Sequence, residues 1–550
     1  MRGAFSFLLA VLLLASAPGT ALAAAVSPPV AATPTPLLAD AAGSPGTSVT
    51  SMGAQWNAAN GSVPPDPSHD AVGWVDGYWY NQTIQVDQRD GLSKPELHAF
   101  VSRAEARVEY ITHRNFKHTV PVEVLSRAEY RNQSHRGSVS PNQTRWNDQV
   151  WRALFIIGNG DNVTRELHSF YGAQVEGYYS PARDKIVIIT ETPNRPVIDN
   201  ATLIHELTHA LQDQYYDIGS ARYQGVTQDG ELARQGLLEG EANYVRARYD
   251  QRCRSGWQCV ATPPQNDGGG SAALNFGIQT VLYQPYAVGP GYVYSLVQHG
   301  GWGAVDTAFQ HPPNTSAQVI HRVQPGNEGS PPPIAFSNTA RNGWHLFPDQ
   351  GRNGSDTVGE ASIYAMFWYQ SYRYQINAVD WQTLYRPSRP YDQFNYVSTP
   401  SAGWANDRIY PYQLGQTDQY GYVWVTKWVD ESNASQFDAA YRTVLSGHHA
   451  KRVAPSTWVV GSGPYAGAYR VVQDGTTVTI VNAPSVAALS NVHPTGAANA
   501  TGSNGDTGGA TSSEASSTST PAPGFGVSSF LVAVFALVVI AAFVARSSRR

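Results

Sequence analysis

The segment IHELTHALQDQYYD, residues 204–217, restricts the fold of this chain more than any other feature. Asp199 and Asn200, which stand just before its apolar positions, are both side chains that cap helix N-termini, so a helix is predicted to begin there. On that helix His205 and His209 lie one turn apart and project from the same face. The helix must therefore bring two imidazoles side by side.

The spacing of the two histidines suits a metal site. Imidazoles four residues apart on a helix can both reach one zinc ion at about 2.0–2.1 Å. Glu206 lies about 100° further round the helix, where its carboxylate can accept a proton from water without binding the metal itself. The sequence therefore predicts a zinc ion with Glu206 as the catalytic base. The simpler interpretation is a buried histidine pair that is satisfied by hydrogen bonds.

Two imidazoles alone hold zinc poorly, and candidate carboxylates for a third ligand follow in residues 229–250, DGELARQGLLEGEANYVRARYD. Apolar residues at helical spacing predict a helix with one packed face. On it Glu239 and Glu241 are about 200° apart, so only one of them can face the metal. Gly240, which costs about 1 kcal/mol inside a helix, indicates a close backbone approach beside the ligand. Glu239 is favoured, and Glu231 and Glu241 stay open.

Around these two helices the sequence predicts an α+β fold that is mostly helical. Period-two alternation on either side of the turn signal SPARD predicts a β-hairpin at 173–190, upstream of the motif. Its edge strand could pair with an extended peptide. Further helices are expected at 92–114, at 145–158 and after about 230 as far as 450, and TVTIVNA (477–483) is expected as a closing strand. Candidates for stabilising an oxyanion are His321, Tyr286 and Tyr292.

The two ends of the chain predict export and a membrane span. A basic start, an apolar run and the small residues ALA are typical of a signal peptide. Near the other end about 19 apolar or small residues, Val527 to Ala545, are enough for a transmembrane helix, and arginines follow it. The chain is thus divided into a signal peptide (1–25), a disordered leader (26–68), an ectodomain (69–485), a Ser/Thr/Gly/Ala-rich stalk (486–522) and a segment with the transmembrane helix and basic tail (523–550).

The cysteines and the charge add two expectations. Cys253 and Cys259 are predicted to form a small disulfide loop, because an exported protein meets an oxidising environment. Several N-x-S/T sequons permit glycosylation there. The net charge of −5 gives no electrostatic case for binding nucleic acid.

HELTHALQDQYYD followed by LLEGEANYV resembles the gluzincin metallopeptidases, whose ligands are the two motif histidines and a glutamate on a later helix. The resemblance implies a zincin-like core, one Zn²⁺ bound by His205, His209 and Glu239, Glu206 as general base, and a peptide or protein substrate. Glu239 follows His209 by 30 residues, a longer interval than in the best-known gluzincins, which keeps Glu231 open. VEGYYSP and the segment 291–321 are similar to exported HExxH proteins of bacteria and archaea.

The C-terminus carries a second resemblance. Pro523-Gly524-Phe525, a hydrophobic span and an arginine cluster together resemble the PGF-CTERM sorting signal of archaeal surface proteins, in which the tail is removed and the protein is attached to a membrane lipid. The sequence thus predicts a zinc-dependent peptidase on the cell surface, anchored to the membrane through its C-terminus. The alternative is a surface or envelope binding protein that uses the same scaffold without proteolysis.

Overall fold

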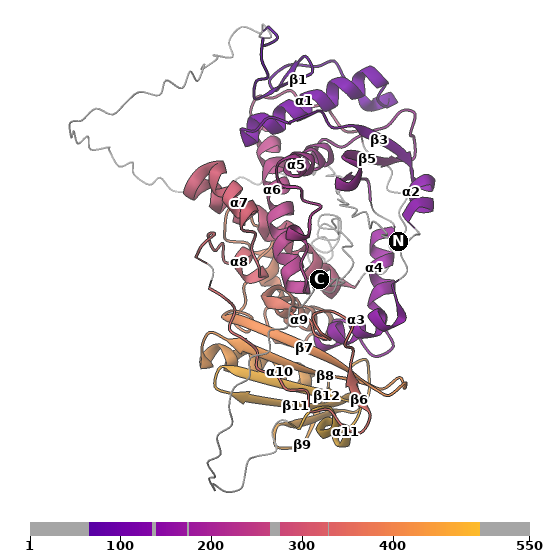
Figure 1. Cartoon of the computed structure of the whole chain (residues 1–550), viewed down its shortest axis with the longest axis vertical. Helices are drawn as coiled ribbons and strands as arrows, with labels where there is room; N and C mark the ends of the chain where they lie inside the picture. The colour runs from indigo at the N-terminus through magenta and orange to yellow at the C-terminus, as the bar shows by residue number, and fades with distance from the viewer. Residues whose placement is uncertain (1–64, 135–138, 173–174, 264–274, 328, 495–550) are drawn as a thin grey trace, which may run out of the picture.

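The computed structural model describes residues 65–134, 139–172, 175–263, 275–327 and 329–494. Figure 1 shows a helical part, coloured indigo to salmon, and an antiparallel sheet at the opposite end, coloured orange to yellow, with α3 and α9 between them. The predicted signal peptide, nearly all of the leader, most of the stalk and the PGF segment lie outside the described residues.

Helices dominate the first part of the chain. Its elements are β1 (Trp74–Val75), β2 (Tyr78–Trp79), α1 (Lys94–Thr112), β3 (Val122–Ser126), α2 (Arg127–Ser134), α3 (Pro141–Ala153), α4 (Val163–Gly172), β4 (Gly177–Ser180), β5 (Lys185–Thr190), α5 (Asn200–Tyr216), α6 (Gln228–Arg254), α7 (Phe276–Gln310) and α8 (Ser316–Ile320). The helix α7 is kinked at Gly300 and Gly301, where the backbone leaves helical geometry.

The second part is built on strands. Its elements are β6 (Trp344–Leu346), α9 (Gly359–Tyr374), β7 (Trp404–Leu414), β8 (Tyr420–Trp428), α10 (Glu431–Gly447), β9 (Lys451–Ala454), β10 (Thr457–Val460), β11 (Gly467–Asp474), β12 (Thr477–Ala483) and α11 (Val486–Val492). The strand expected at 477–483 is confirmed as β12. The last helix, α11, occupies the first residues of the segment predicted as a stalk.

A three-stranded sheet lies beside the motif helix, in the order β3-β5-β4. Strands β4 and β5 form an antiparallel hairpin across the turn Pro181–Arg183, at the place where the sequence predicts one. Strand β3 was not predicted, and it pairs parallel to β5. The other side of β4 is therefore an edge of this sheet, and it faces α5.

The predicted fold class is wrong, because the described residues contain a seven-stranded antiparallel sheet in the order β6-β7-β8-β12-β11-β10-β9. Both faces of this sheet are covered. On β8, Tyr422 and Trp424 belong to the main hydrophobic core with helices α9 and α10, whereas Val423 and Val425 pack in a second cluster with α11. A strand that is buried on both faces shows no polar–apolar alternation, so its sequence pattern does not indicate a strand.

The predicted transmembrane helix cannot be compared with the described residues, because it follows them in the chain. Within the described ranges, every helix is too short or too polar to cross a bilayer. The segment from Val527 to Ala545 lies outside those ranges.

Two buried carboxylates link the sheet to α9 and α9 to the helical part. Asp407, on β7, accepts hydrogen bonds from the backbone N–H of Gly359 at 2.9 Å and from the indole of Trp424 at 3.0 Å. Asp356, just before α9, accepts the backbone N–H of Gln228 at 3.0 Å. Because Gln228 is the first residue of α6, the sheet side of the molecule caps the helix that carries the candidate third ligand.

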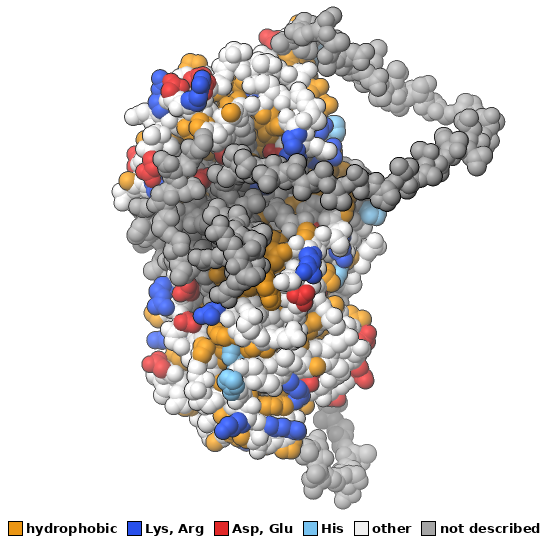
Figure 2. Space-filling view, turned by 180° about the vertical axis from the view of Figure 1, so that it is seen from behind, with side chains coloured by type: hydrophobic (Ala, Val, Ile, Leu, Met, Phe, Trp, Pro, Cys, Tyr) orange, Lys and Arg blue, Asp and Glu red, His pale blue; other side chains and the backbone are white. Residues whose placement is uncertain are grey.

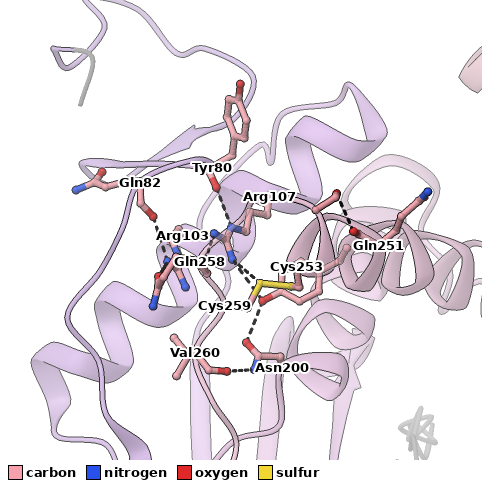
Figure 3. Close-up of a disulfide and its surroundings, with 12 residues drawn as sticks. Tyr80, Gln82, Arg103, Arg107, Asn200, Gln251, Cys253, Gln258, Cys259 and Val260 are labelled. Atoms are coloured by element: carbon pink, nitrogen blue, oxygen red, sulfur yellow. Dashed lines mark hydrogen bonds between the residues drawn. A yellow bond between two sulfur atoms is a disulfide. The ribbon is translucent and has the colours of Figure 1, made fainter. Parts of the chain in front are cut away.

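The disulfide predicted between Cys253 and Cys259 is present at the end of α6 (Figure 3). Its loop packs against α1, where the guanidinium of Arg107 donates to the carbonyl oxygen of Gln258 at 2.8 Å. The side-chain amide of Asn200, the first residue of α5, donates to the backbone just after the loop. The disulfide loop therefore joins α1, α5 and α6 at one point.

Replacing both cysteines by serine is expected to lower the free energy of unfolding by about 2 kcal/mol, because the unfolded chain regains the entropy of a short open loop. Thermal unfolding of the variant beside the wild type measures this loss. An unchanged melting temperature would show that the hydrogen bonds to the loop, such as that from Arg107, hold it in place without the disulfide.

Candidate metal centre

Helix α5 holds both histidines as its sequence predicts. It begins with an N-cap at Asp199, whose carboxylate accepts the backbone N–H of Thr202 at 3.0 Å. The Nε2 atoms of His205 and His209 approach to 2.9 Å, and both side chains are fully buried. The rest of the helix packs on the hairpin and on α1 and α6, which keeps the two rings at one side of the core.

Helix α6 brings Glu239 to the two imidazoles. Its Oε2 lies 3.0 Å from Nε2 of His205 and 3.4 Å from Nε2 of His209. The ligand atoms of these three residues all lie within 4.8 Å of one another, and each residue is buried. The structure therefore brings together the three residues that were proposed as metal ligands.

The two other carboxylates considered as the third ligand bond to residues outside the cluster. Glu231 accepts the backbone N–H of Gly225 at 2.7 Å and the side-chain amide of Gln235 at 2.9 Å. Glu241 forms a buried ion pair with Arg114 at 2.8 Å. Glu239 is thus the carboxylate of the three that lies in the cluster.

The close approach expected at Gly240 is confirmed. A Cβ atom there would lie 2.6 Å from the carbonyl oxygen of Gly289, on α7. A Cβ on Gly289 would in turn lie 2.5 Å from the carbonyl oxygen of Gly236. Helices α6 and α7 therefore touch backbone to backbone next to Glu239, which fixes the depth at which its carboxylate enters the cluster.

Glu206 is held at one oxygen and free at the other. Its Oε2 accepts the backbone N–H of Tyr179, on the edge of β4, at 2.7 Å. Its Oε1 is buried and has no hydrogen-bond partner within the part of the chain that the structure describes. Burial raises the pKa of this carboxyl to about 8. The phenol of Tyr179 also bonds to Asp213 on α5 at 2.8 Å, so β4 is tied to the motif helix at two points.

The donor set fits a divalent metal ion. Burial lowers the pKa of His205 to about 4, which keeps its imidazole neutral, as a metal ligand must be. Burial opposes ionisation of Glu239, but the charge of His209 and hydrogen bonds from both histidines outweigh it and lower its pKa to about 2. One oxygen of Glu239, Oε1, is buried without a partner. Two imidazoles and one carboxylate are the ligands of one common type of catalytic zinc site.

The three residues suggested for oxyanion stabilisation are placed as follows. His321 lies at the end of α8, where its Nε2 pairs with the buried carboxylate of Glu360 at 2.8 Å. Tyr286 and Tyr292 are buried in α7 on either side of Gly289, and the ring of Tyr286 stacks on Tyr283. His321 is therefore engaged with Glu360.

Sequence reasoning missed Gln212 and the backbone of Tyr179, both of which contact the motif residues directly. Gln212 bonds to Nδ1 of His209 at 2.9 Å. It stands three residues after that histidine, a spacing that places two side chains together on a helix, so the sequence held a usable signal. The contact of Tyr179 joins residues 27 positions apart and had no such signal.

Comparison with protein families finds one match, over residues 345–493, to a family model described as "Domain of unknown function (DUF8575)". The matched region runs from β6 to α11 and contains none of the residues of the metal cluster. Searches of curated proteins and of solved structures found no match. The match describes the sheet part of the chain and carries no statement about activity.

Proposed function

We propose that this protein is a zinc-dependent peptidase that hydrolyses peptide bonds outside the cell. The observation that carries the proposal is the buried cluster of His205, His209 and Glu239 with the unpartnered carboxylate oxygen of Glu206 on the same helix. Zinc bound by these ligands would supply Lewis-acid catalysis for hydrolysis.

In this mechanism the chain's own residues position and move the proton. The backbone N–H of Tyr179 holds Oε2 of Glu206, and Oε1 is left without a hydrogen-bond partner among the described residues. Oε1 removes a proton from the water that attacks the scissile carbonyl and later delivers it to the leaving amine. All residues of β4 are buried and the N–H of Tyr179 already bonds to Glu206, so this strand edge is not open for pairing with an extended substrate.

Two features bear on where this protein acts and on which substrate. The disulfide between Cys253 and Cys259 is typical of proteins that leave the cytoplasm. Figure 2 shows Lys and Arg side chains interspersed with Asp and Glu on the face that it displays, an arrangement that gives no electrostatic case for nucleic acid.

The alternative is a surface or envelope binding protein that uses the same scaffold without proteolysis, with or without a metal. It is favoured by one observation, the complete burial of His205, Glu206, His209 and Glu239. A structural zinc site is closed by protein ligands, whereas a catalytic site keeps a position for substrate. Peptide hydrolysis by the purified protein separates the two proposals.

Chelation of the purified protein tests the proposed function. Hydrolysis of a mixed fluorogenic peptide library is expected to stop when zinc is removed and to return when about one zinc per chain is restored. A Glu239→Gln variant is expected to bind zinc too weakly for recovery at that ratio. Proteolysis that survives zinc removal would overturn the proposal, and a zinc-loaded protein that cleaves no peptide would favour the binding protein.

A further inference from the structure

The ring of His209 has a second nitrogen, and its surroundings determine how the ring can bind a metal. Nδ1 lies 2.9 Å from Oε1 of Gln212, one turn further along α5. A neutral imidazole carries its proton on one nitrogen and a lone pair on the other. The group that Gln212 presents to Nδ1 therefore decides which nitrogen is free for the metal.

The orientation of the Gln212 amide follows from its other contacts. Its nitrogen donates to the carbonyl oxygen of Leu238 at 2.9 Å and to Oε2 of Glu241 at 3.0 Å. Both partners are acceptors only, so the amide nitrogen must face them, and the oxygen must face His209. An amide oxygen accepts, and Nδ1 of His209 is then the donor.

The Gln212 contact is itself held by a buried ion pair. Glu241 accepts from the guanidinium of Arg114 at 2.8 Å. Arg114 lies over the rings of Tyr216 and Trp302, at 5.6 and 5.4 Å, and also pairs with an aspartate on α7. Because Arg114 only donates, it keeps Glu241 an acceptor, and Glu241 keeps the amide of Gln212 from turning over.

The other imidazole has no such partner. Nδ1 of His205 is buried and makes no hydrogen bond in the part of the chain that the structure describes. The orienting contact is thus specific to His209. Glu241, which the sequence left open as a ligand, is hydrogen-bonded to Gln212 and is connected to the cluster through that residue.

We propose that Gln212 is a positioning residue that holds His209 as its Nδ1–H tautomer and directs the lone pair of Nε2 towards the metal. Glu241 and Arg114 act through Gln212 by fixing its amide. The proposal rests on the proposed function for the presence of a metal, but the tautomer of His209 does not require one. Loss of a partner of this kind typically weakens metal binding by about 10- to 100-fold.

The experiment uses full-length protein labelled with ¹⁵N-histidine. NMR of the ring nitrogens, recorded without metal at pH 9, reports which nitrogen of each neutral imidazole carries the proton, and a His209→Gln variant assigns the signal. Wild-type His209 is expected to carry it on Nδ1. Gln212→Met, which has the same length but no acceptor of comparable strength, is expected to shift the proton towards Nε2, whereas Gln212→Glu retains an acceptor and is expected to keep it on Nδ1.

Zinc affinity, measured by competition with a chromophoric chelator, is the second readout. Gln212→Met is expected to bind zinc about 10- to 100-fold more weakly than wild type. Thr208→Val is the matched control, because Thr208 is equally buried on α5 but its hydroxyl bonds only to the carbonyl of Ile204. Its affinity and its His209 tautomer are expected to match wild type.

Two results would overturn the inference: a wild-type His209 ring with its proton on Nε2, or a Gln212→Met variant with wild-type zinc affinity. The first can be obtained from wild-type protein alone, so a variant that fails to fold does not remove the test. A wild-type chain that binds no zinc would end the proposed function, while the tautomer comparison would still decide the role of Gln212.

Discussion

Replacement of Glu206 by glutamine is expected to lower peptide hydrolysis by about a thousand-fold while the protein still binds zinc. The amide has the size of the carboxylate, and its oxygen can still accept the N–H of Tyr179. It has no basic oxygen that could take a proton from water, so the chemical step loses its base. Measuring kcat/KM with a fluorogenic peptide and zinc content on the same preparation separates these two effects.

Glu231→Gln serves as the matched control for this substitution. Glu231 lies on α6 and bonds to Gly225 and Gln235, away from the metal cluster. Its variant is expected to keep wild-type activity. If Glu206→Gln kept more than a tenth of the activity, Glu206 would not be the base. If it lost zinc instead, its carboxylate would be needed to hold the metal.

Gly240→Ala is expected to destabilise the protein by about 3 kcal/mol or more. The added Cβ would lie 2.6 Å from the carbonyl oxygen and 2.7 Å from the carbonyl carbon of Gly289, and both are backbone atoms that no rotamer change can move. Helices α6 and α7 would have to separate beside Glu239. Unfolding in guanidinium measures the loss of stability, and zinc affinity is expected to fall with it.

Gly303→Ala provides the comparison for that variant. Gly303 also lies in a helix, α7, but a Cβ there would meet no atom within 4 Å. Alanine is the better helix former by about 1 kcal/mol, so this variant is expected to be as stable as wild type or more so. Equal stability of the two alanine variants would show that the α6–α7 contact can relax at no cost.

The candidate site was predictable where its geometry is local to one helix. The Asp199 cap, the one-turn spacing of His205 and His209, and the opposed directions of Glu239 and Glu241 all follow from helix periodicity. Gly240 indicated a tertiary contact, because glycine destabilises a helix interior and is expected there where another backbone comes close. These features gave the ligand set that the structure brings together.

Features that depend on distant pairs were not predictable from the residues themselves. The seven-stranded sheet joins segments whose aromatic residues, such as Trp424 on β8, are buried on both faces and show no alternation. The N–H of Gln228, at the start of α6, bonds to Asp356, which lies 128 residues further along the chain. His321 meets Glu360 from another helix. In each case the partner is set by the fold, and no local pattern points to it.

The cap that Asp356 places on α6 has a consequence for the integrity of the molecule. The connection at residues 329–340 is irregular and largely exposed, and is the kind of segment that proteases cut first. A chain nicked there would not fall into two halves, because α6 and α7 pack on α9, and the hydrogen bond from the backbone of Gln228 to Asp356 joins the two fragments. The two fragments would remain one complex, and Asp356 would still accept the N–H of Gln228 at the start of α6, the helix that carries Glu239.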